Sequence, residues 1–121
     1  MKRKETGILG EKLARDFLKK RGYRIIETNY RSPAGEIDII ARHRDSLVFI
    51  EVRTKKSPVF GSPEESITLA KMERLRNTAF HYQQTHDNLL PLWRIDVVAI
   101  ELNQKGKPSR IELIENAVGE A

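Results

Sequence analysis

Two apolar segments on either side of a polar tip constrain the fold of this chain most strongly. Residues 36–42 and 47–54 are rich in β-branched and aromatic side chains, and the tip at residues 43–46 reads His-Arg-Asp-Ser. This pattern predicts two antiparallel strands joined by a short turn. Because the turn fixes which residues lie opposite each other, the hairpin makes a definite prediction about its side chains.

The register of this hairpin predicts a pair of opposed carboxylates. If Arg42 pairs with Leu47 across the tip, Asp38 lies opposite Glu51, and Arg53 lies on the same face as both. Directly opposed residues have Cβ atoms about 5 Å apart, so two like charges there destabilise a sheet unless a cation lies between them. Mg²⁺ is typically held by one or two carboxylates together with water and phosphate oxygens. We therefore expect a divalent metal site at Asp38 and Glu51.

Three neighbouring groups are candidates to complete this site. The backbone carbonyl of Val52 could add a metal ligand, and Arg53 could neutralise the carboxylates or hold a phosphate. Glu11 lies at the edge of the apolar stripe of the first predicted helix and is a candidate outer ligand or water-positioning group. As an i, i+4 partner of Arg15, however, Glu11 would have only a structural role.

Two alternatives to a metal site stay open at the level of the residues. The carboxylates could belong to an ordinary ion-pair cluster with Arg53, Arg31 or Lys71. A one-residue slip of the hairpin could instead put them on opposite faces of the sheet. Asp96, which precedes another apolar run, is expected to be a structural hydrogen-bond acceptor.

The rest of the chain predicts an α/β fold around one central mixed sheet. Apolar residues recur at helical spacing in residues 6–21 and again in residues 67–84. Gly10 lies in the apolar face of the first helix, where it permits close packing. The order helix, three strands, helix, two strands is typical of an α/β sandwich, and we expect residues 1–121 to form one domain. The strands outside the hairpin are expected at residues 23–30, 94–102 and 110–114.

The positive charge of the chain is concentrated in its first 24 residues. This segment carries nine Lys and Arg against three acidic residues, a net charge of +6, while the remaining residues carry −1. A concentrated basic face attracts polyanions such as nucleic acids, although a solvated helix face has the same composition. The absence of cysteine excludes disulfides and thiolate metal sites. Without an apolar run near ~20 residues or a signal-peptide pattern, we expect a cytoplasmic protein and no membrane partner.

Several motifs, in this order along the chain, resemble the YraN family of small bacterial proteins. The match spans nearly the whole chain. This family is in turn similar to the PD-(D/E)XK nuclease superfamily, and especially to the archaeal Holliday junction resolvases. The motifs are Gly10-Glu11, residues 35–41 (GEIDIIA), 49–53 (FIEVR) and 60–67 (FGSPEESI), Lys71, and residues 94–100 (RIDVVAI).

The resemblance implies a restriction-endonuclease-like αβββαβ core and assigns roles to four residues. By this analogy Asp38 is the motif aspartate, Glu51 is the second metal ligand, and Glu11 is the acidic residue on the helix. The lysine of the superfamily motif aligns with Arg53. Because arginine keeps its proton, it cannot act as a base in place of that lysine. The candidates to replace the lysine are Lys55, farther along the same strand, and Lys71, on the second helix.

Two candidate functions follow from these expectations. The first is a Mg²⁺- or Mn²⁺-dependent endonuclease that hydrolyses phosphodiester bonds in DNA, with branched, flapped or single-stranded structures as candidate substrates. Since the resembled resolvases act symmetrically, this function also implies a homodimer. The second is a non-catalytic nucleic-acid-binding or adaptor module on a nuclease fold, with Arg53 marking the lost chemistry. The residues expected to contact nucleic acid are Lys12, Arg15, Lys19, Lys55 and Lys71.

Overall fold

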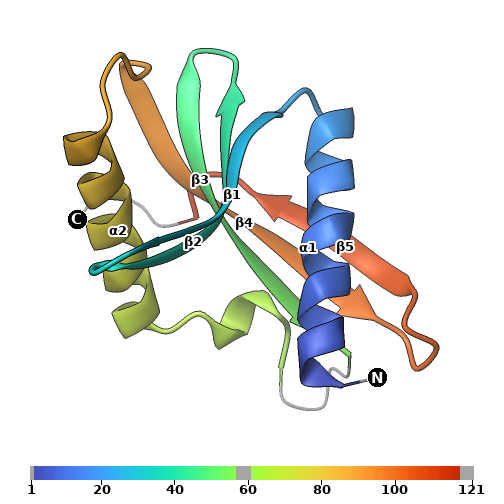
Figure 1. Ribbon diagram of the computed structural model, residues 1–121. Coiled ribbons are helices and arrows are strands. Elements are labelled where there is room, and N and C mark those ends of the chain that lie inside the picture. The colour runs from blue at the N-terminus through green and yellow to red at the C-terminus, as the bar shows by residue number, and fades with distance from the viewer. Residues whose placement is uncertain (1, 57–60, 118–121) are drawn as a thin grey trace.

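A computed structural model describes residues 2–56 and 61–117 and has an α/β fold (Figure 1). Its element order confirms the predicted α/β class, the mixed central sheet flanked by helices, and the αβββαβ core. Phe60, in one of the sequence motifs, lies outside the described residues. The elements are α1 (Arg3–Lys20), β1 (Arg24–Ser32), β2 (Gly35–His43), β3 (Ser46–Lys55), the 3₁₀ helix η2 (Glu64–Ser66), α2 (Leu69–Thr85), β4 (Leu92–Leu102) and β5 (Pro108–Ile114).

The five strands form one sheet in the order β1-β2-β3-β4-β5. Only β3 and β4 are parallel; the other neighbouring strands are antiparallel. The β2–β3 hairpin has the predicted register, with Arg42 opposite Leu47 and Ile40 opposite Phe49. A one-residue slip is thereby excluded for the paired part of the hairpin. Residues 92–102 follow β3 in parallel over its full length, so the end of β4 lies beside the end of β3.

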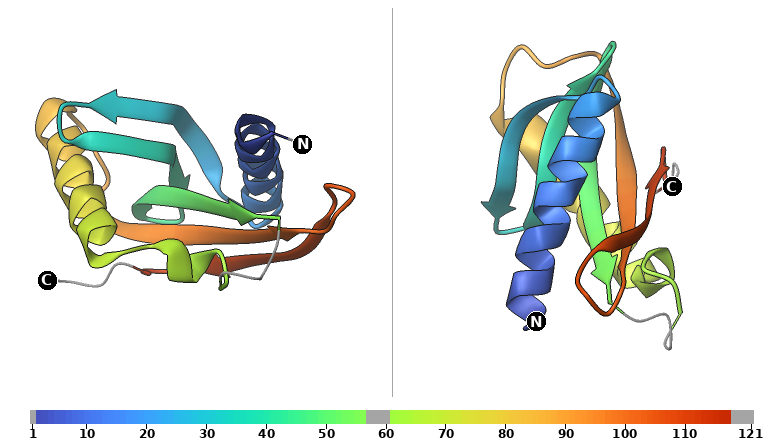
Figure 2. Two further views of the ribbon diagram at one scale, coloured as in Figure 1. Left: turned by 90° about the horizontal axis from the view of Figure 1, so that it is seen from below. Right: turned by 90° about the vertical axis from the view of Figure 1, so that its right-hand side faces the viewer.

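The two helices cover opposite faces of the sheet (Figure 2). On one face, Ala14 and Leu18 of α1 pack on alternate residues of the central strands, such as Val48 and Ile50. On the other face, α2 packs on the intervening residues, among them Phe49. This alternation is what burial of both sheet faces requires. No helix in the described residues is both long enough and apolar enough to cross a bilayer.

Close packing of α1 on β3 depends on Gly10. A Cβ atom added at Gly10 would lie 1.9 Å from Oγ1 of Thr54 and 2.9 Å from its Cβ, whereas one added at Gly7 would meet no described residue within 4 Å. The absence of a side chain therefore lets the helix backbone approach the C-terminal end of β3. This confirms the close approach predicted for Gly10 and brings the next residue, Glu11, toward the sheet.

Candidate metal centre

The candidate site lies where β2 separates from β3. The ladder between these strands has Ile39 opposite Ile50 as its last pair, and beyond it β1 and β2 curve toward α2 (Figure 1). Ile37 and Ile40 both belong to the core beneath α2, while Ile39 faces α1. Side chains of a regular strand alternate, so the alternation is interrupted at residue 38. The regular register that was predicted to put Asp38 directly opposite Glu51 therefore ends one residue short of Asp38.

Asp38 is nevertheless held close to β3 by a specific hydrogen bond. Its Oδ2 atom accepts the backbone N–H of Val52 at 2.8 Å. Without this bond, the N–H of Val52 would have no acceptor on β2 beyond the end of the ladder, and an unpaired backbone N–H is costly to bury. The carboxylate of Asp38 thus takes the place of a backbone carbonyl and stays beside the residue that precedes Val52, which is Glu51.

Glu51 is a buried carboxyl group with an incomplete set of partners. The residue is 6% exposed, and burial, followed by the charge of nearby Asp38, raises its pKa from 4.5 to about 8. Lys71 Nζ of α2 lies 3.3 Å from Oε2 of Glu51. The contact lacks hydrogen-bond geometry, so Oε2 is buried without a hydrogen bond from any residue that the structure describes. Such an oxygen is available to a cation that coordinates it directly.

The two carboxylates form part of the wall of an open cavity of about 790 Å³. Glu11 of α1 lines the same cavity, and burial together with the charge of Asp38 raises its pKa. The predicted position of Glu11 at the edge of the core is confirmed, since it is half-buried. The cavity is lined by Arg3, Thr6, Gly7 and Glu11 from α1, by Asp38, by residues 51–56 and by Ser66.

The donor set fits a hard divalent ion held mainly by two protein carboxylates. Asp38 and Glu51 lie close enough for the charge of Asp38 to raise the pKa of Glu51, and one Glu51 oxygen has no hydrogen bond to the described part of the chain. Across residues 2–56 and 61–117, no group of three or more His, Cys, Asp or Glu side chains is placed to hold a metal ion. An ion bound here would therefore need further ligands, such as water. Mg²⁺ meets this description, because it keeps several waters and binds one or two carboxylates plus substrate phosphates. Val52 lines the cavity beside them.

The cations predicted around the site fall into two groups. Arg53 and Lys55 line the cavity, and Nε of Arg53 is buried without a hydrogen bond to any described residue. Arg31, one of the cations considered as a neutraliser, instead lies 3.4 Å from Glu36 in an exposed ion pair. Of the cations that were considered as ion-pair partners of the carboxylates, Lys71 forms a salt bridge with Glu51.

Three basic residues of α1 that were predicted to contact nucleic acid do not line the cavity. Lys12 and Lys19 are exposed, and Arg15 is half-buried, one turn after Glu11. The prediction missed Arg3, which does line the cavity together with Gly7 and Glu11. Helical spacing contained this signal, because residues four apart lie on the same face of a helix.

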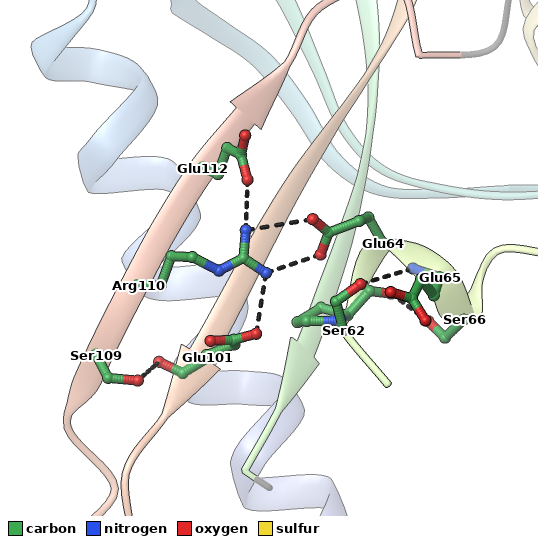
Figure 3. Close-up of polar contacts among 9 residues, drawn as sticks. Ser62, Glu64, Glu65, Ser66, Glu101, Ser109, Arg110 and Glu112 are labelled. Atoms are coloured by element: carbon green, nitrogen blue, oxygen red, sulfur yellow. Dashed lines mark hydrogen bonds and ion pairs between the residues drawn. The ribbon is translucent and has the colours of Figure 1, made fainter. Parts of the chain in front are cut away.

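Two other charged clusters have structural roles. Buried Asp96 accepts hydrogen bonds from Tyr23 Oη, Arg94 Nε and the backbone N–H of Asn116, as predicted for a structural acceptor. Arg110 of β5 binds the carboxylates of three glutamates and ties η2 to the sheet (Figure 3). The glutamates are Glu64, Glu101 and Glu112.

Comparison with known proteins places the chain in a family. A UPF0102 protein of Dehalococcoides mccartyi is 50% identical over 118 residues, covering 98% of this chain and 96% of the relative. One of Caldicellulosiruptor saccharolyticus is 41% identical (97% and 99% covered), and one of Roseiflexus castenholzii is 46% identical (99% and 98% covered). The model of the family described as "Uncharacterised protein family UPF0102" matches residues 10–100. The chain therefore belongs to the UPF0102 family, which is YraN-like.

Proposed function

We propose that this protein is a metal-dependent endonuclease that hydrolyses phosphodiester bonds in DNA. The observation that carries the proposal is the proximity of Asp38 to Glu51, whose buried Oε2 receives no hydrogen bond from any residue that the structure describes, in the wall of a cavity lined by basic residues. Placing the half-buried carboxylate of Asp38 beside the buried one of Glu51 is costly unless a cation compensates them. Such an arrangement lowers the stability of the metal-free protein, so we attribute it to the binding of an ion.

Each residue of the site has a distinct role in this proposal. Asp38, Glu51 and the carbonyl of Val52 hold Mg²⁺ or Mn²⁺, which when bound supplies the charge that lowers the pKa of a water and polarises the phosphate. Glu11, which lines the same cavity, orients the attacking water by accepting its hydrogen bond. Arg53 stabilises the negative charge that develops on the phosphate oxygens.

The wider placement of the family is part of the same proposal. The αβββαβ order and the positions of Glu11, Asp38 and Glu51 support descent from PD-(D/E)XK nucleases, although fold alone does not establish activity. Arg53 cannot remove a proton from water, and Lys71, whose Nζ already lies 3.3 Å from Glu51, is the better-placed replacement for the motif lysine. The exposed Lys12 and Lys19 would contact phosphates that flank the cavity.

One observation favours a second candidate, a non-catalytic nucleic-acid-binding module. Lys71 places a positive charge against Glu51 and so partly satisfies the carboxylate without a metal. If this ion pair is permanent, the cavity retains its basic rim but has no hydrolytic centre. Binding of nucleic acid would then not depend on divalent ions, and substitution of Glu51 would leave affinity unchanged.

Cleavage assays separate the two candidates. Labelled duplex, single-stranded, flap and four-way-junction DNA would be incubated with Mg²⁺ or Mn²⁺ and the wild type, Glu51→Gln or Glu73→Gln. Glu73 is a matched control, since it lies exposed on α2 in an i, i+3 ion pair with Arg76. Cleavage by the wild type and Glu73→Gln, but not by Glu51→Gln, is expected. Equal binding without cleavage by all three proteins would contradict the proposal and favour the binding module.

A further inference from the structure

A second cavity adjoins the candidate metal centre. It has a volume of about 310 Å³ and shares Lys55 and Lys56 with the first cavity. Its other wall is the start of the β4–β5 hairpin. The two lysines therefore lie between the carboxylates and the hairpin. The remaining lining residues are Glu101, Leu102, Asn103, Gln104 and Ser109.

The β4–β5 hairpin presents two lysines on a turn of defined shape. Lys105 and Lys107 are exposed, and Oδ1 of Asn103 accepts the backbone N–H groups of both, at 2.9 and 3.0 Å. Gly106 between them has a φ of +76°, which glycine adopts without strain. The asparagine side chain and the glycine thus fix the backbone from which both ammonium groups extend.

Glu101, the acidic side chain among the described residues that line the second cavity, is paired with a cation. Glu101 Oε1 lies 3.1 Å from Arg110 Nη2, and the same guanidinium binds Glu64 at 2.8 Å (Figure 3). Arg110 therefore offsets part of the negative charge that would otherwise repel an anion; it also binds Glu112. The path from Lys55 to the hairpin tip presents mainly positive charge to a ligand.

We infer that the β4–β5 hairpin is a second phosphate-binding surface, which holds the backbone of a nucleic-acid strand that passes through the candidate metal centre. The C-terminal end of β3, the start of α1 and this hairpin lie at the same end of the molecule (Figures 1 and 2). The inference rests on the proposed function in one respect, that the ligand is a nucleic acid. It does not require that the nucleic acid is hydrolysed. Lys105 and Lys107 contact phosphates and do not read bases.

Strand geometry gives the distance that the nucleic acid must span. Lys55 follows Glu51 by four strand residues and lies beside Glu101 in the β3–β4 register. At ~3.3 Å per residue this is about 13 Å, or roughly four nucleotides of a strand stacked as in a duplex, at ~3.4 Å each. The hairpin lies beyond that point. A strand of about 3 nucleotides centred on the carboxylates is therefore too short to reach it even when the strand is extended, while one of about 16 nucleotides is long enough.

Binding of strands of these two lengths tests the inference. Fluorescence anisotropy with 5′-labelled single-stranded DNA, in EDTA and over a range of salt concentrations, would compare the wild type with Lys105→Gln/Lys107→Gln. The control is Arg42→Gln/Arg44→Gln, which removes the same charge at the β2–β3 turn, at the opposite end of the sheet (Figure 1). The hairpin variant is expected to lose affinity for the long strand only. Its salt slope should fall by about 1.4, at ~0.7 per phosphate contact.

The outcomes separate this inference from the proposed function. Equal losses in the hairpin and control variants, or an unchanged salt slope in the hairpin variant, would overturn the role of the hairpin. If the wild type binds no strand of either length at low salt, both the hairpin surface and the nuclease are overturned. Length-dependent binding that needs the hairpin lysines, together with no cleavage of any DNA, would retain the surface and reject only the hydrolysis.

Discussion

Replacing Glu51 by glutamine is expected to remove a pH-dependent loss of stability from the metal-free protein. Burial and the charge of Asp38 raise the pKa of Glu51 to about 8 in the folded chain, from 4.5. Between these two values the folded state binds more protons than the unfolded state, so stability falls as the pH rises. Glutamine keeps the shape of the side chain but does not titrate.

The size of this effect follows from the pKa difference. Each unit is equivalent to about 1.4 kcal/mol, so between pH 5 and pH 9 the wild type should lose on the order of 4 kcal/mol relative to Glu51→Gln. Urea unfolding in EDTA at several pH values measures this directly. Glu73→Gln, on the exposed face of α2, should follow the wild type at every pH. A stability difference between wild type and Glu51→Gln that is the same at pH 5 and pH 9 would refute the buried, protonated state of Glu51.

Two further predictions concern the supports of the site. Gly10→Ala should destabilise the protein by about 1–3 kcal/mol in urea unfolding, because its Cβ would collide with Thr54. Gly7→Ala, whose Cβ would meet no atom of the described residues within 4 Å, should be neutral or stabilising by up to ~1 kcal/mol. Equal effects would contradict the close helix–strand packing. Asp96→Asn leaves Arg94 without its counter-charge and should cost about 3 kcal/mol, while wild-type stability in this variant would show that the network is dispensable.

The hairpin is the part of the structure that the sequence predicted most accurately. Its tip and apolar strands specify the register, and the structure has Ile40 opposite Phe49 as expected. The divergence at Asp38 could not be read from the same pattern. It depends on β1 and β2 curving toward α2, where Gly35 lies against Arg74 and Thr78. That contact is between segments far apart in the chain, and periodicity within one strand does not contain it.

Partner choice among charged residues was predictable only in part. Helical spacing placed Glu11 at the edge of the core, and Gly10 explained why α1 approaches β3. The sequence offered Arg31 and Lys71 equally as partners for the carboxylates, and only the fold separates them, because α2 brings Lys71 to Glu51. Long side chains at a surface have many charged neighbours of similar energy, so tertiary structure decides which pair forms.

Calorimetric titration with Mn²⁺ and Mg²⁺ tests the central claim, that Asp38 and Glu51 hold a divalent ion, most directly. The wild type, Asp38→Asn, Glu51→Gln and the control Glu73→Gln would be compared at pH 6 and pH 8.5. The wild type and the control should bind the ion, more tightly at the higher pH because the ligand carboxyl must lose its proton. Both site variants should bind at least about tenfold more weakly. Equal affinity in all four proteins, or no binding by the wild type at millimolar metal, would contradict the claim.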